Sequence, residues 1–225
     1  MTHTMSDIMT IIADRRQRLD RAPFLRSLAA SSSLDELRAF VPHLHFFVLG
    51  FQDVLRLAHE RVEEPRLRAI SGQHRAEDAG HDQWFVSDVH ELECARDLVW
   101  VFGDEHQVTR DVTYALISES IHATDDRVRL VLPLVLEAAG SLFFPRVVTL
   151  LERAGYSGGL RYFARSHQEV EAGHDMFSEA SQRELEAIPF DDSTFEEAVV
   201  VVHRCFDLCE QLAAHLERHR LTAAA

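Results

Sequence analysis

Two short segments of the chain resemble each other and carry side chains of the types that bind metal ions. The first reads His-Arg-Ala-Glu-Asp-Ala-Gly-His-Asp from His74 to Asp82, and the second reads His-Gln-Glu-Val-Glu-Ala-Gly-His-Asp from His167 to Asp175. Each therefore has two histidines seven residues apart with a carboxylate between them. Imidazole and carboxylate ligands without thiolate suit iron or manganese, although they also bind zinc. The duplicated pattern favours a metal centre.

Helical geometry would bring the donors of each segment together. On a helix, His74, Asp78 and His81 occupy positions i, i+4 and i+7, which lie within one stripe of the surface. The same spacing holds for His167, Glu171 and His174. The glycine before each second histidine is a poor helix former, and it could let a ligand or another backbone approach closely.

Glu137 is a third candidate ligand, because it lies in the almost wholly apolar segment 130–144. A carboxylate in such surroundings is costly to bury unless it is paired or coordinates a metal. Two adjacent histidine-rich sites would need a bridging carboxylate, so the sequence predicts that Glu137 joins them.

Readings without a metal remain open. The two segments could be solvated helix faces that merely look alike, or buried histidines that pair with the carboxylates four residues away. Glu137 could instead pair with Arg146 or Arg161.

Apolar residues recur with the period of an α-helix along most of the chain, which predicts an all-α fold. No linker rich in Gly, Pro or Ser divides the chain, so we expect one domain over residues 1–225. The first motif falls within the third range below, and the second within the sixth. The predicted helices are 6–30 with an interruption near Pro23, 34–62 with a kink at Pro42, 65–90, 104–124, 128–154, 160–186 and 194–220.

Composition excludes several classes of function. The net charge of −14 disfavours nucleic acid and anionic membranes as partners, and no apolar run reaches the roughly 18 residues of a membrane span. All 23 basic residues are arginines, so no lysine is present to form a Schiff base. Neither nucleotide-binding glycine motif occurs. Three cysteines, an odd number, indicate reduced thiols and a cytoplasmic protein.

The order of these residues resembles that of the heme-oxygenase-like diiron oxidases. Glu137 follows His81 by 56 residues, and the His167 motif begins 30 residues after Glu137. The resemblance implies a single-domain, seven-helix heme-oxygenase-like bundle that uses two iron ions and O2 to oxidise a small organic substrate. N-oxygenation, desaturation and oxidative C–C cleavage are the reactions it implies. A homodimer and an external electron donor are expected with them, and manganese is possible in place of iron.

The resemblance also implies a ligand set. It carries over to His81, Glu137, His167, Glu171 and His174, with Glu171 where the family usually has aspartate. One ligand varies, and here His74, Glu77 or Asp78 could provide it. The candidate metal ligands are therefore His74, Asp78, His81, Glu137, His167, Glu171 and His174.

Two other functions fit parts of the pattern. A ferritin-like diiron protein for iron oxidation or storage would use, in order, Asp53, Asp78 with His81, Glu137, and Glu171 with His174, but it leaves His74 and His167 unexplained. A non-catalytic interaction module would leave the converging acids and histidines without a purpose. For an oxidase, a substrate pocket could be walled by Phe46, Phe47, Phe51, Phe143 and Phe144.

Overall fold

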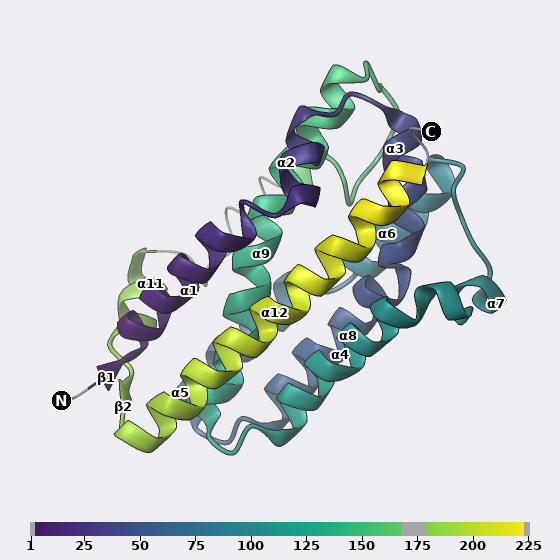
Figure 1. Cartoon of the computed structure of the whole chain (residues 1–225). Coiled ribbons are helices and arrows are strands. Elements are labelled where there is room, and N and C mark those ends of the chain that lie inside the picture. Colours follow the sequence, from purple (N-terminus) through teal and green to yellow (C-terminus); the bar gives the residue numbers. More distant parts are fainter. Residues whose placement is uncertain (1–2, 168–178, 223–225) are drawn as a thin grey trace.

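The computed structural model describes residues 3–167 and 179–222 (Figure 1). Helices dominate the described part, and its two strands have two residues each, which confirms the predicted all-α class. In its first half the elements are β1 (His3–Thr4), α1 (Met5–Leu19), α2 (Pro23–Ala30), α3 (Leu34–Phe40), the 3₁₀ helix η1 (Val41–Leu44), α4 (His45–Arg61), α5 (Pro65–Glu77) and α6 (His81–Glu91). They continue with α7 (Leu98–Val101), the 3₁₀ helix η2 (Asp104–His106), α8 (Gln107–His122), α9 (Asp126–Arg153), α11 (Glu179–Glu186), β2 (Pro189–Phe190) and α12 (Asp192–Thr222).

The two long helices α9 and α12 organise the packing. Helix α12 contacts α1, α3, α8 and α9, while α4 packs against α8 on the other side of the bundle (Figure 1). The apolar side chains of α12 recur at intervals of three and four residues, the spacing of a one-sided amphipathic helix. Its buried positions include Ala198, Val201, Val202, Cys205, Phe206, Cys209, Leu212, Ala213 and Leu216. Strands β1 and β2 pair antiparallel and join the start of α1 to the segment before α12.

Proline interrupts the first helices where the sequence predicted. Pro23 begins α2, where its missing N–H costs nothing because the first turn of a helix has no intrahelical acceptor for it. Pro42 lies in η1, the 3₁₀ turn between α3 and α4. This turn lets α4 leave α3 in a new direction and carry its own apolar face toward α8.

The predicted single helix over residues 65–90 is wrong, and the break lies inside the first motif. Helix α5 ends at Glu77, α6 begins at His81, and Gly80 between them has a φ of 92°. Only glycine adopts this left-handed region at little cost. Nothing lies within 4 Å of where a Cβ of Gly80 would be, so this glycine serves the turn and not a close approach.

The predicted helix over 160–186 is seen only in part. Residues 160–164 are not helical, residues 165–167 are, and α11 covers Glu179–Glu186. The rest of the second motif, including Glu171 and His174, lies outside the described residues.

Helix α9 is long and apolar enough to span a membrane, by length and composition only. Its apolar residues are interrupted by Arg129, Glu137 and Arg146, so an unbroken apolar run of about 18 residues is absent from α9, as the sequence analysis stated. A buried core helix passes the same test, and α9 packs against α1, α2, α4 and α12. The length and composition of α9 are therefore only weak evidence for a membrane span.

Candidate metal centre

Two carboxylates converge on one nitrogen of His74. Its Nε2 atom lies 2.7 Å from Oε1 of Glu137 and 2.9 Å from Oδ2 of Asp78. A ring nitrogen carries at most one hydrogen. The hydrogen on Nε2 of His74 is aligned with Oε1 of Glu137. Oδ2 of Asp78 is buried and has no hydrogen-bond partner within the described part of the chain. A buried carboxylate oxygen left in this way is a group that a cation would satisfy.

The burial of this cluster perturbs its acids and bases. His74 is 1 % exposed and Asp78 3 %. Burial by itself would lower the pKa of His74, but the neighbouring Asp78 and Glu137 carboxylates together raise that pKa to about 10. Burial would likewise raise the pKa of Asp78, and His74 and His81 hold it well below its usual range. In the metal-free protein a proton on His74 thus offsets the buried negative charge, and a bound cation could replace that proton.

Two more histidines extend the cluster. Nδ1 of His81 lies 3.0 Å from Oδ1 of Asp78 and 3.2 Å from Nε2 of His167. Nδ1 of His167 lies 2.7 Å from the carbonyl oxygen of Tyr162. Because a carbonyl only accepts, Nδ1 of His167 carries a hydrogen, and Nε2, on the side of His81, is the nitrogen that could bind a metal. A metal-binding histidine is commonly oriented by such a bond from its second nitrogen.

Asp88, which the sequence analysis did not single out, holds the segment that orients His167. Its two carboxylate oxygens accept hydrogen bonds from the backbone N–H groups of Arg161 at 2.8 Å and Phe163 at 2.9 Å. Asp88 is 1 % exposed and lies on α6, two turns after His81. An acid between the apolar positions Phe85 and Val89 was the available signal, because such a position faces the core.

Gln52 on α4 is a second residue that sequence reasoning missed. Its side-chain amide donates to the backbone oxygen of Asp78 at 3.1 Å. This bond ties the end of α5, and with it the Asp78 carboxylate, to α4. A lone glutamine on an amphipathic helix gives no sequence signal of such a role.

The structure brings five of the seven predicted ligands together, from α5, the α5–α6 turn, α6, α9 and the segment after Phe163. They are His74, Asp78, His81, Glu137 and His167. Of the three candidates for the variable ligand, both His74 and Asp78 lie in the cluster, while Glu77 accepts a hydrogen bond from Gln73.

The arginines considered as partners of Glu137 make other contacts. Arg146 pairs with Asp20, and the Arg161 guanidinium lies over the ring of Trp84. The Glu137 carboxylate is 13 % exposed and contacts His74. Glu137 is therefore partly buried, and the side chain it contacts is a candidate metal ligand and neither of these arginines.

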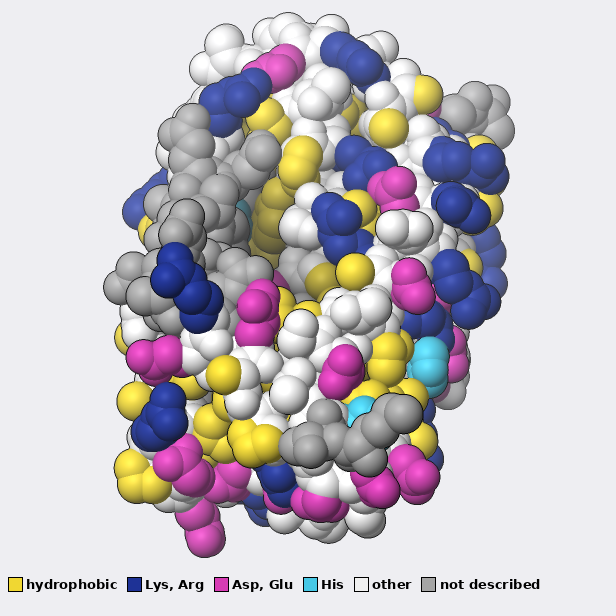
Figure 2. Space-filling model, turned by 90° about the vertical axis from the view of Figure 1, so that its left-hand side faces the viewer, with side chains coloured by type: hydrophobic (Ala, Val, Ile, Leu, Met, Phe, Trp, Pro, Cys, Tyr) yellow, Lys and Arg dark blue, Asp and Glu magenta, His cyan; other side chains and the backbone are white. Residues whose placement is uncertain are grey.

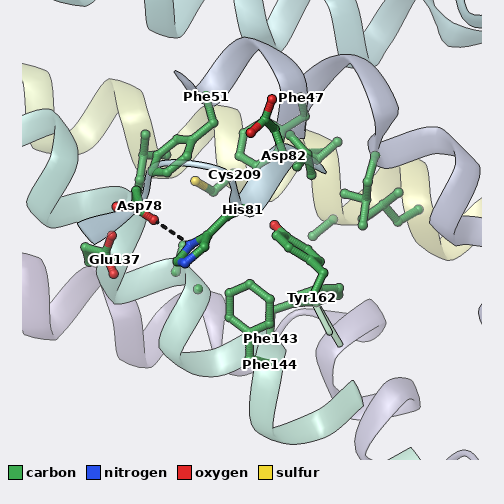
Figure 3. Close-up of a pocket in the computed structure, with 18 of the residues that line it drawn as sticks. Phe47, Phe51, Asp78, His81, Asp82, Glu137, Phe143, Phe144, Tyr162 and Cys209 are labelled. Atoms are coloured by element: carbon green, nitrogen blue, oxygen red, sulfur yellow. Dashed lines mark hydrogen bonds and ion pairs between the residues drawn. The ribbon is translucent and has the colours of Figure 1, made fainter. Parts of the chain in front are cut away.

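An apolar cavity of about 140 Å³ opens beside the cluster. One face of the molecule is hollowed, and hydrophobic side chains line the depth of the hollow (Figure 2). Asp78, His81 and Glu137 lie together at one end of the pocket, with aromatic rings beside them (Figure 3). Four of the five predicted phenylalanines line it: Phe47, Phe51, Phe143 and Phe144. The fifth, Phe46, packs instead against Phe102 and Tyr114.

Comparison with known proteins identifies the fold of this chain. No family model matches the chain, and no curated protein matches its sequence. Among solved structures, a domain of unknown function with a heme oxygenase-like fold from Shewanella denitrificans OS217 superposes with a TM-score of 0.70. The match covers 96 % of this chain and 93 % of that one at 12 % sequence identity. The chain therefore has the heme-oxygenase-like fold that its residue order resembled.

Proposed function

We propose that this protein is a nonheme diiron oxidase that uses O2 to oxidise a small organic substrate. The observation that carries the proposal is the meeting of Asp78 and Glu137 at one nitrogen of His74, which leaves a buried carboxylate oxygen unsatisfied beside the cavity. Carboxylates and imidazoles without a thiolate among them are the donor set that iron and manganese accept.

The residues would divide the ligand roles by position. His74, Asp78 and Glu137 would hold one ion, because a donor atom of each lies within 4.8 Å of the others. His81 and His167 would contribute to the second, together with Glu171 and His174 of the duplicated motif. When bound, the iron pair would supply electrons to O2 and so provide the oxidising power of the reaction.

The cavity indicates the class of substrate. Its walls come mainly from aromatic and aliphatic side chains of α2, α4, α9 and α12, while the cluster supplies its acidic and imidazole groups. A space of about 140 Å³ accepts a benzene-sized group, and apolar walls exclude water from it. We infer a substrate with an apolar portion of that size, oriented so that its reacting bond faces Glu137 and His81.

Iron content and O2 uptake test the proposal together. Apo-protein is loaded anaerobically with Fe(II), its bound iron is counted, and the visible spectrum and O2 consumption are recorded on mixing with O2. We expect two irons per chain and a new visible absorption accompanied by O2 uptake. Glu137→Ala should lose at least one iron, while His122→Ala, which changes an exposed histidine of α8, should keep both.

Full iron binding by Glu137→Ala would contradict the ligand assignment. Two bound irons that consume no O2 would contradict the oxidase function while leaving the metal centre intact. Two Mn(II) bound in preference to Fe(II) would show that manganese is the native ion.

The ferritin-like alternative is weakened by Asp53. Its carboxylate is 57 % exposed and pairs with Arg56 at 2.9 Å, so it lies on the surface of α4 and not in the cluster. Loading of many irons per chain would revive this alternative. A homodimer, a cytoplasmic location and an external electron donor accompany the oxidase proposal as further predictions.

A further inference from the structure

Four histidines from three separate elements gather at the end of the bundle where α12 finishes. His43 lies in η1, His106 in η2, and His215 and His219 lie one turn apart on α12. The last turns of α12 run beside α3, which leads directly into η1 (Figure 1). None of these histidines belongs to the duplicated motif or to the cavity lining described above.

Three of these rings have nitrogen atoms close to one another. One ring nitrogen from each of His43, His215 and His219 lies within 4.8 Å of the others. The rings of His43 and His219 are 3.5 Å apart between centroids, and those of His215 and His219 are 4.6 Å apart. Nitrogens that share a tetrahedral zinc ion at 2.0–2.1 Å are about 3.4 Å from one another. The rings of His43 and His219 are stacked at an interplanar angle of 19°, so one of them must rotate out of the stack to complete the site.

His106 is placed to orient His43. Their Nδ1 atoms are 2.9 Å apart, so one ring donates to the other. If His43 donates, its Nε2 keeps the lone pair, which is the form that binds a metal. Nε2 of His106 lies 3.3 Å from a carboxylate oxygen of Glu105 without the alignment of a hydrogen bond. A metal-bound imidazole usually donates its second ring N–H to a carboxylate, a carbonyl or water, and here His106 takes the place of that acceptor for His43.

The cluster also contains a buried nitrogen that needs a partner. His215 is 1 % exposed, and its Nε2 atom has no hydrogen-bond partner among the residues described. Its Nδ1 atom lies 3.3 Å from a guanidinium nitrogen of Arg218, which only donates, so the neutral ring carries its hydrogen on Nε2. An ion at Nε2 therefore requires the other tautomer, in which the Arg218 contact is given up. Burial also lowers the pKa of His43 to about 2, with further lowering by His219, so this ring is neutral at physiological pH.

We propose that His43, His215 and His219 form a second metal site, which takes a divalent ion of the zinc type. Three imidazoles without a carboxylate among them suit Zn²⁺ better than the carboxylate-rich cluster of the first site does. His106 holds His43 in its binding orientation. His219 is only half-buried, so the ion can enter from the surface.

A metal bound by these histidines would stabilise one wall of the apolar cavity. Leu44 follows His43 in the chain, Leu216 follows His215, and both leucines line the apolar cavity. A metal that joins His43 to α12 therefore fixes the two elements that form this part of the cavity wall. The site is independent of the iron proposal, since the two share no candidate ligand.

Zinc binding to matched variants tests the proposal. Zn²⁺ content and affinity are measured by equilibrium dialysis for the wild type, His219→Ala, Glu137→Ala and His122→Ala. We expect His219→Ala to lose one zinc equivalent, or to bind it more than about tenfold more weakly, the cost of losing even an outer partner of a metal ligand. Glu137→Ala and His122→Ala should keep that equivalent.

X-ray absorption at the zinc edge gives a second readout that needs no folded His219 variant. With one equivalent of Zn²⁺ on the double variant His81→Ala/His167→Ala, which leaves at most two of the candidate imidazoles in the first cluster, we expect at least three imidazole ligands. Equal zinc binding by His219→Ala and His122→Ala, or a zinc surrounded mainly by oxygen, would overturn the proposal. The iron experiment can fail without changing this result. The zinc measurement counts only the zinc equivalent that is lost in His219→Ala.

Discussion

At the scale of single residues, His74 is the centre of the candidate iron site. Its Nε2 atom contacts a carboxylate from its own helix end, Asp78, and one from α9, Glu137. Such a pair of buried acids raises the pKa of an imidazole because the charged ring offsets their repulsion. A metal ion competes for the same position, so protonation and metal binding at His74 exclude each other.

Metal affinity should consequently rise with pH. With a pKa of about 10, His74 is protonated at pH 7 to 8.5 and must release that proton when an ion binds. One proton released corresponds to an affinity that increases about tenfold per pH unit over this range. Mn²⁺ binding followed by electron paramagnetic resonance at several pH values measures the slope. His74→Ala should bind more weakly with a much smaller slope, and a wild-type affinity independent of pH would contradict the pKa.

At the scale of elements, the turn between α5 and α6 decides where His81 points. A continuous helix would place His74, Asp78 and His81 along one stripe, whereas the left-handed Gly80 starts a new helix at His81. The resulting geometry brings Nδ1 of His81 to 3.0 Å from Oδ1 of Asp78. Helical periodicity thus brings His74 and Asp78 together, and the turn adds His81 to them.

Substitution of Gly80 tests this turn. Gly80→Ala should destabilise the protein by about 1–2 kcal/mol, because a Cβ disfavours the left-handed region. No steric clash contributes, since nothing lies within 4 Å of the position of that Cβ. Gly80→Asn should cost less, because asparagine tolerates this backbone conformation. Urea unfolding measures both. Equal stabilities of wild type and Gly80→Ala would show that the turn is not needed.

At the scale of the whole molecule, contacts between distant segments place the second half of the site. Asp88 on α6 holds the backbone of residues 161–163, and the Tyr162 carbonyl in that segment orients His167. Glu137 reaches His74 only because α9 packs against α5. The site therefore depends on the bundle as a unit.

Removal of the Asp88 carboxylate should affect both stability and the metal site. Asp88→Ala leaves two backbone N–H groups without their acceptor, which should cost about 3 kcal/mol of unfolding free energy. Metal affinity should fall as well, since His167 loses the segment that orients it. Asp88→Asn keeps one acceptor oxygen and should retain more of both properties. An Asp88→Ala protein with wild-type stability and metal content would refute this positioning role.

Helical periodicity is a local property and is visible in the sequence. It therefore predicted the all-α class and the interruptions at Pro23 and Pro42. The sequence also showed the histidine and carboxylate donors of the two motifs. The duplicated motif and the acid in an apolar helix also pointed to five residues that do meet. Three features depended on tertiary structure: the break at Gly80, the hold of Asp88 on residues 161–163, and the meeting of His43 with His215 and His219. The break requires a backbone conformation that glycine permits but does not impose. The other two join residues far apart in the chain, and only the packing of whole helices decides which of many polar side chains become neighbours.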